Sequence, residues 1–433
     1  MMKLSLWLVS AALAAVASAA APEARGSFDY AAHLGNLSPY RSAAVPSGMT
    51  TTLPDGCVVD QVMLAARHGS RYPLSSELTS ITGLVQALGN ATGAVAKARL
   101  PADLAFLKAG YTSTLGHDDL TAPGRLQLFQ HGVEFALAYP HLRATGVLAG
   151  NQDRVLESAQ WFAQGYFGRG WGAMNASAFA TINEDHATVS WITPTGTCKK
   201  WDYNYGNNAT IEWGSVYLPR IAKRLNKVVP GVGFTTDNVH GALYACAYDL
   251  AAHGVSPWCG AFTPAEIKDF EYELDLLMDG AFGYNLPTPM GAVLGGLYVQ
   301  KLVERFTNET GTASPMYLEF GHDTTIDLAL TALGLFADKP PLSASGPARA
   351  SRKFRTSSQV PFAAKMVWER FACGAGGAPQ IRLLLNDAPV PLAMCAKTDK
   401  RLGSCALADF VHANAASVEH GWGDARWNAT CGM

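Results

Sequence analysis

Three short apolar segments in this chain are each followed directly by polar residues and then by a helical pattern. They span residues 62–66, 146–149 and 316–320. Continuous apolar runs of this length are typical of strands that are buried on both faces of an α/β sheet. Ligands of such sheets bind beyond the carboxyl ends of the strands. The polar residues 67–73, 151–154 and 321–325 therefore mark a candidate site.

The stretch between the second and third segments has a different pattern. Residues 216–225 and 264–278 are helical in pattern and strand signals are sparse, so residues 173–280 predict a mostly helical cap. Near the C-terminus, residues 364–371 and 380–385 predict a hairpin across a glycine-rich loop. We expect an α/β fold, with a mixed sheet flanked by helices and a mostly helical cap over the site. The expected core covers about 50–75, 140–170 and 285–433, and the cap about 76–135 and 173–280.

The N-terminus has the pattern of a targeting signal. A short positive start at Lys3 precedes an apolar run over residues 4–16, and Ala17-Ser18-Ala19 offers small residues for cleavage. We expect a signal peptide at residues 1–19, with an uncleaved anchor as the alternative. Elsewhere no run approaches the roughly 18 apolar residues of a membrane span, so we expect none in the mature chain.

Composition and cysteine spacing narrow the class of protein. The 433 residues are 48% hydrophobic and 16% charged, with a formal net charge of -2, which gives no reason to expect a nucleic-acid partner. The eight cysteines behind a signal peptide predict disulfides. No CxxC spacing occurs, so no zinc site is expected. Local pairs are the simplest expectation, Cys246 with Cys259 and Cys395 with Cys405.

Glycosylation sequons agree with a secreted or cell wall-associated protein. In each of them the asparagine lies two positions before Ser or Thr, without an intervening proline. The candidate asparagines are Asn36, Asn90, Asn175, Asn208, Asn308 and Asn428.

The first polar segment carries the clearest chemistry. Arg67, His68 and Arg71 lie within five residues, directly after an expected buried strand. Arginine matches phosphate oxygens in bidentate geometry, and neighbouring cations disfavour the charged form of a histidine. Such a histidine can attack phosphorus and form a covalent intermediate. A structural histidine among surface arginines is the alternative, but buried cations without an anion are costly.

The third polar segment supplies the complementary groups. His322 can donate a hydrogen bond to the same phosphate, and Asp323 can protonate the leaving oxygen. The protonated form of Asp323 is favoured at acid pH, which predicts an acidic optimum. The alternative is that Asp323 only caps the helix that follows.

Two further segments contain residues that could belong to the site. Arg154 opens a helix after the second strand and is the best-placed third guanidinium for the phosphate, although it could be a solvated arginine. Residues 116–119 also contain His-Asp, at His117-Asp118, but they follow polar residues. We interpret them as the cap of a helix that begins near Thr121, not as catalytic.

These motifs resemble those of the histidine acid phosphatases, which include fungal phytases and secreted acid phosphatases. The resemblance covers nearly the whole mature chain, residues 20–433. It implies that His68 carries the phosphoryl group, that Asp323 donates the proton, and that Arg67, Arg71, Arg154 and His322 hold the phosphate. It also implies that no metal or other cofactor is needed. The disulfides it implies are Cys57 with Cys373, Cys198 with Cys431, Cys246 with Cys259, and Cys395 with Cys405.

The expected function is therefore a secreted acid phosphatase that hydrolyses small phosphomonoesters, with phytate among its candidate substrates. Residues 74–84 after the first motif contain no lysine, which favours broad specificity over a dedicated phytase, the alternative. Acidic residues Glu271, Glu273 and Asp275 could tune the charge around the substrate, although a solvated helix face is the simpler interpretation. The rivals are a metal-dependent hydrolase, a phosphoglycerate mutase type of transferase and a non-catalytic extracellular phosphate-binding protein. The oligomeric state does not follow from the sequence.

Overall fold

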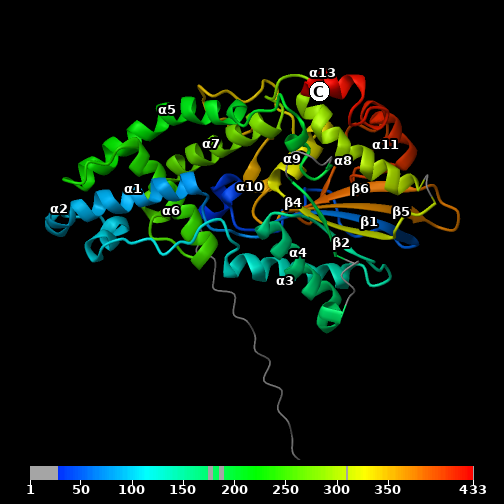
Figure 1. Ribbon diagram of the computed structural model, residues 1–433, viewed down its shortest axis with the longest axis horizontal. Helices are drawn as coiled ribbons and strands as arrows, with labels where there is room; N and C mark the ends of the chain where they lie inside the picture. The colour runs from blue at the N-terminus through cyan, green and yellow to red at the C-terminus, as the bar shows by residue number, and fades with distance from the viewer. Residues whose placement is uncertain (1–27, 174–178, 185–189, 309–310, 433) are drawn as a thin grey trace, which may run out of the picture.

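The computed structural model describes residues 28–173, 179–184, 190–308 and 311–432. The expected signal peptide and the sequon at Asn175 lie outside these residues. A mixed β-sheet with helices on both faces forms one half of the molecule, and a second group of helices lies beside it (Figure 1). None of the described helices is both long enough and apolar enough to cross a bilayer.

The described strands form one sheet in the order β3-β2-β4-β1-β5-β6-β7, and β8 also pairs with β6. Strands β3, β2, β4 and β1 are parallel, whereas β5 to β8 pair antiparallel. The three expected strands are thus the neighbours β2, β4 and β1, and the expected hairpin is β5–β6. The bounds are β1 Cys57–Arg67, β2 Val147–Gly150, β3 Phe179–Ile182, β4 Met316–Gly321, β5 Lys365–Cys373, β6 Gln380–Leu385, β7 Ala388–Val390 and β8 Cys405–Ala406.

Alternate side chains of β1 face two helical layers, as the two-residue period of a strand requires. Val62 and Leu64 pack with α3 (Ala122–Ala138) and α4 (Asp153–Phe167). Met63 and Ala65 pack with α8 (Met290–Thr307), α9 (Asp323–Ala332) and α11 (Leu407–Ala413). The sheet is therefore buried on both faces, as the apolar runs predicted.

The cap is a separate helical cluster with its own apolar core. In Figure 1 these helices lie to the left of the sheet. They are α1 Ser75–Asn90, α2 Thr92–Lys97, α5 Asn204–Val228, α6 Thr236–His253 and α7 Pro264–Phe282. The remaining short helices are α10 Thr356–Gln359, α12 Ala415–Val418 and α13 Ala425–Cys431.

One expected boundary differs from the structure. The sequence placed residues 76–135, and so most of α3, in the cap, but Leu128 and Phe135 of α3 pack in the cluster that covers the sheet. Gly132 explains the close contact with α4, because a Cβ there would lie 2.1 Å from the carbonyl oxygen of Phe162. Helix α3 therefore belongs to the α/β core.

The cysteines form the four disulfides that the family resemblance implied. They are Cys57–Cys373, Cys198–Cys431, Cys246–Cys259 and Cys395–Cys405. The described sequon asparagines differ in exposure. Asn90, Asn208 and Asn308 are exposed and Asn428 is half-buried. Asn36 is only 7% exposed, a position that is treated with the site below.

Candidate active site

The ends of three neighbouring parallel strands bring the expected site residues together. Arg67, the last residue of β1, lies opposite Gly321, the last residue of β4, and the His68 backbone N–H donates to the Gly321 carbonyl at 3.1 Å. Helix α4 begins directly after β2, and α9 directly after β4. An open cavity of about 950 Å³ lies at this edge, between the sheet and the cap. Its lining includes all six expected residues, Arg67, His68, Arg71, Arg154, His322 and Asp323.

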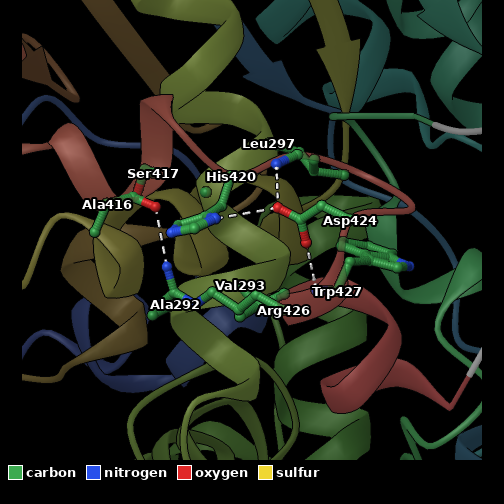
Figure 2. Close-up of a pocket in the computed structure, with 11 residues that line it drawn as sticks. Ala292, Val293, Leu297, Ala416, Ser417, His420, Asp424, Arg426 and Trp427 are labelled. Atoms are coloured by element: carbon green, nitrogen blue, oxygen red, sulfur yellow. Dashed lines mark hydrogen bonds and ion pairs between the residues drawn. The ribbon is translucent and has the colours of Figure 1, made fainter.

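A second cavity lies between α8, α12 and α13 (Figure 2). Its volume is about 10 Å³, which is room for one water at most. His420 and Asp424 pair beside it at 3.2 Å, with side chains that are 48% and 30% exposed. The large cavity is therefore the candidate active site.

The tautomer of His68 is fixed by its own loop. His68 Nδ1 lies 2.9 Å from the Gly69 carbonyl oxygen, which can only accept, so Nδ1 carries the proton. The lone pair of the neutral ring is then on Nε2. Burial, together with the positive charges of Arg67 and Arg154, holds the pKa of His68 well below its usual value. His68 is thus a neutral imidazole with a nucleophilic Nε2.

Arg67 is fully buried and held on several sides. Its Nη1 donates to the backbone carbonyls of Asn36 and Val360, and its guanidinium stacks 4.6 Å from the centre of the Phe362 ring. Burial is the main cause that lowers the pKa of Arg67, to about 10, so it remains a cation. Its Nη2 lies 2.9 Å from Asp323 Oδ2.

Arg71 is oriented from the cap. Its Nη1 donates to the Tyr248 hydroxyl at 3.1 Å and lies 3.4 Å from Glu77 Oε2. The Tyr248 hydroxyl in turn donates to Glu77 Oε2 at 2.6 Å. Burial lowers the pKa of Arg71, but Tyr248 and Glu77 outweigh burial and the net shift is upward. Helices α1 and α6 of the cap therefore help to fix a cation of the core.

Arg154 lies in the first turn of α4 and pairs with Asp118, Nη1 to Oδ1, at 2.9 Å. Asp118 belongs to the His117-Asp118 segment, which was interpreted as a helix cap. Thr121 caps α3 by accepting from the Gly124 N–H, so the helix does begin where expected. Asp118 instead serves as the ion-pair partner of Arg154, a contact that no local pattern in the sequence indicates.

Asp323 is the first residue of α9, and its Oδ2 accepts from Arg67 and also from Asn36 Nδ2, each at 2.9 Å. Burial alone would raise the pKa of Asp323, but the Arg67 charge and the Asn36 amide outweigh it and lower this pKa. The lowered pKa favours the ionised carboxyl group when no substrate is bound. The expectation that acid pH would favour its protonated form needs a substrate, as argued below.

The position of Asn36 bears on one expected glycosylation site. A glycan would be attached to Nδ2, the atom that donates to Asp323, and the side chain is buried in the cavity wall. A sequon records only local sequence, whereas this contact joins residues 287 positions apart. We propose that Asn36 carries no glycan and acts as part of the site.

His322 has an acidic partner that the sequence did not suggest. Its Nε2 lies 2.7 Å from Glu184 Oε2, and both side chains are buried. The His322 and His68 rings lie edge to face with centres 5.6 Å apart. Together with the pairs described above, this contact gives each of the three arginines and His322 one carboxylate partner. The partners are Asp323, Glu77, Asp118 and Glu184.

An α/β core, a helical cap and a histidine among arginines at the strand ends define a phosphate-handling site of the histidine phosphatase kind. The profile of the histidine phosphatase superfamily (branch 2) matches residues 58–386. The chain belongs to this family.

Individual relatives give a consistent picture. The chain is 32% identical to phytase A of Aspergillus fumigatus, over 87% of this chain and 86% of the relative. It is 29% identical to the thiamine-repressible acid phosphatase of Schizosaccharomyces pombe, over 99% and 96% of the two chains. Among solved structures, the phytase of D. castellii is similar with a TM-score of 0.81 and 25% identity, covering 98% of this chain and 92% of that one.

Proposed function

We propose that this protein is an acid phosphatase that hydrolyses phosphomonoesters through a phosphohistidine at His68. The observation that carries the proposal is the neutral His68 ring, whose lone pair is on Nε2 and which three arginines surround. The relatives named acid phosphatase and phytase support it. Arg67, Arg71, Arg154 and His322 hold the phosphate, because their donors converge on the cavity wall beside His68.

In the first step His68 Nε2 attacks phosphorus and the bond to the ester oxygen breaks. Asp323 transfers its proton to that oxygen, and the alcohol leaves. In the second step Asp323, now a carboxylate, takes a proton from water while the water oxygen attacks the phosphohistidine. Inorganic phosphate leaves, and His68 and Asp323 return to their starting states. Protons and electron pairs balance over the cycle.

The Arg67–Asp323 ion pair explains how a carboxyl group with a lowered pKa can act as an acid. In the empty site the Arg67 charge stabilises the Asp323 carboxylate. A phosphate ester that binds Arg67 brings negative charge next to Asp323, which favours the protonated form of the carboxyl group. The substrate therefore raises the pKa of its own proton donor, and acid pH helps the proton to arrive.

His68→Ala tests the mechanism. We expect turnover of p-nitrophenyl phosphate to fall by at least about a thousandfold, as for the loss of a nucleophile. The wild-type enzyme should form an acid-labile phosphoenzyme after rapid quench, and the variant should form none. Near-normal turnover in the variant would contradict the proposal, and activity lost in chelator would favour the metal-dependent rival.

The cap side of the cavity favours broad specificity. Among the described lining residues there is no lysine, and the arginines are those of the phosphate site. The other charged groups there include the carboxylates of Glu77, Asp237 and Glu273, while His240 pairs with Glu273 at 2.8 Å. A substrate with several phosphates would place some of them near these carboxylates. We infer that simple monoesters are better substrates than phytate.

Initial rates test this inference. The ratio of kcat/KM for phytate to kcat/KM for p-nitrophenyl phosphate should lie below one at acid pH. A ratio well above one would support the dedicated phytase instead.

Secretion is also part of the proposal, because the four disulfides suit an oxidising compartment. Release of the mature chain into the medium by its native host would test it.

A further inference from the structure

Glu184 is the one acidic partner in the site that follows the edge strand β3. Its backbone N–H donates to Asn151 Oδ1 at 3.0 Å, next to the end of β2. Its side chain lines the same cavity as His68 and Arg154. Oε2 pairs with His322 Nε2 at 2.7 Å, whereas the buried Oε1 has no hydrogen-bond partner among the described residues. A buried carboxylate oxygen without a donor costs free energy. Glu184 Oε1 bears this cost while it lies among groups that bind phosphate in the proposed function.

The position of this carboxylate resembles that of a bound anion. Gly150 leaves the space for it, since a Cβ there would lie 1.7 Å from Glu184 Oε1. Glu184 also acts electrostatically on Arg154, in addition to its contact with His322. It therefore engages two of the four side chains that hold phosphate in the proposed function.

We propose that the Glu184 carboxylate occupies His322 in the empty site and competes there with the phosphate of the substrate. This inference rests on the proposed function, because it assumes that His322 binds phosphate. One N–H of His322 cannot serve both anions fully, and the two negative charges repel each other. Removing the charge of Glu184 should therefore strengthen the binding of phosphate to His322. Glu184 thereby limits the affinity for phosphate, although it does not react.

Other charged and titratable groups line the same side of the cavity as Glu184. Among the described residues they are Arg154 at the start of α4, His322 and Asp323 at the start of α9, and His68 after β1. Asp323 is already paired with Arg67 and Asn36, and Arg154 with Asp118. Glu184 is thus the carboxylate whose charge acts on His322 by direct contact.

The test compares the inhibition constant of inorganic phosphate for wild type and for Glu184→Gln at about pH 7. Glutamine keeps the size and a carbonyl oxygen but cannot carry the charge. At about pH 7 the variant should bind roughly tenfold more tightly, the factor that 1.4 kcal/mol of removed repulsion gives.

Two further variants keep the test decisive. Asp153→Asn removes an exposed charge from the start of α4 and should leave the inhibition constant of phosphate as in wild type. Glu184→Ala removes both charge and hydrogen bond and should also bind phosphate more tightly at about pH 7. Weaker phosphate binding by Glu184→Gln and Glu184→Ala would overturn the inference, because Glu184 would then be positioning His322. Equal affinity throughout would overturn it too, and neither result would touch the phosphohistidine at His68.

Discussion

Arg67 and Asp323 form a buried ion pair, with Nη2 2.9 Å from Oδ2, that links the end of β1 to the start of α9. The same arginine is placed to bind phosphate and to control the charge of the proton donor. The pKa of Asp323 is lowered when no substrate is bound. The carboxyl group can therefore act as an acid once the phosphate of a substrate also binds Arg67 and favours its protonated form. Binding and proton transfer are therefore coupled through one guanidinium.

Replacing the proton donor should separate substrates by their leaving groups. Asp323→Asn retains the shape of the side chain but has no proton to give. Turnover of an alkyl phosphate such as glycerol phosphate should fall by about 100-fold to 10,000-fold, the usual contribution of a general acid. Release of p-nitrophenolate needs little protonation, so its first turnover should slow far less.

A rapid-mixing experiment can measure this difference. With p-nitrophenyl phosphate the variant should give a burst of about one p-nitrophenolate per site, followed by slow turnover, because the carboxylate is also missing from the hydrolysis step. An equal loss for both substrates, without a burst, would mean that Asp323 is not the proton donor.

Helix α3 packs closely against the loop that carries His68, and this contact leads to a second prediction. A Cβ on Gly124 would lie 2.1 Å from the Ser70 carbonyl oxygen, and one on Gly69 would lie 2.5 Å from the Gly124 carbonyl oxygen. Gly124→Ala must therefore push the loop that carries His68. We expect the free energy of unfolding to fall by about 1–3 kcal/mol, as for overpacking, together with a loss of kcat/KM.

Gly83 offers a matched control in α1, since a Cβ there would meet nothing within 4 Å. Gly83→Ala should leave kcat/KM unchanged and raise the free energy of unfolding by up to about 1 kcal/mol. Urea unfolding and steady-state kinetics of the two variants measure both effects. If Gly124→Ala behaved like Gly83→Ala, the contact between α3 and the loop would not matter for the site.

The sequence predicted those parts of the site that follow from the pattern of neighbouring residues. Strands β1, β2 and β4 are buried on both faces, so they appear as apolar runs, and parallel pairing places their polar ends together. No local pattern indicates Asn36 or Glu184, because each contacts its partner from a distant segment of the chain. Asn36 contacts Asp323, and Glu184 contacts His322. Helix α3 was assigned to the cap for the same reason. Its Gly132 packs against α4 and its Gly124 against the loop at Ser70, and both contacts arise only in three dimensions.

The ion pair between Asp118 and Arg154 predicts an effect on substrate binding. Asp118 has a φ of 61°, a conformation that asparagine tolerates well, so Asp118→Asn removes the charge without straining the backbone. Arg154 should then be less well oriented toward phosphate. We expect KM for p-nitrophenyl phosphate to rise about twofold to fivefold, in line with a partly exposed ion pair, while kcat changes little. Asp119→Asn at the next residue is the control, and an equal change in both variants would contradict a role for this pair.

Asp279 in α7 predicts how stability depends on pH. Burial, with smaller effects of Asp338 and Asp275, raises the pKa of Asp279 to about 7 despite hydrogen bonds from Tyr284 and Asn285. The unfolded chain has the ordinary, lower pKa, so the folded state binds the extra proton between about pH 4 and pH 7. The stabilisation by this protonated group is complete below the ordinary pKa and is lost as pH rises through about 7.

The free energy of unfolding should therefore fall with rising pH across that window, with a contribution of up to about 1.4 kcal/mol per pH unit from this one group. Asp279→Asn keeps a carbonyl oxygen that can accept from the Tyr284 N–H and removes the titration. The variant should lose stability less steeply from about pH 4 to pH 7, although Asp275 and Asp327, whose pKa values are also raised mainly by burial, should leave part of the slope. Urea unfolding at several pH values, with exposed Asp55→Asn as the control, measures the slopes. Identical slopes for wild type and Asp279→Asn would mean that Asp279 does not take up a proton on folding.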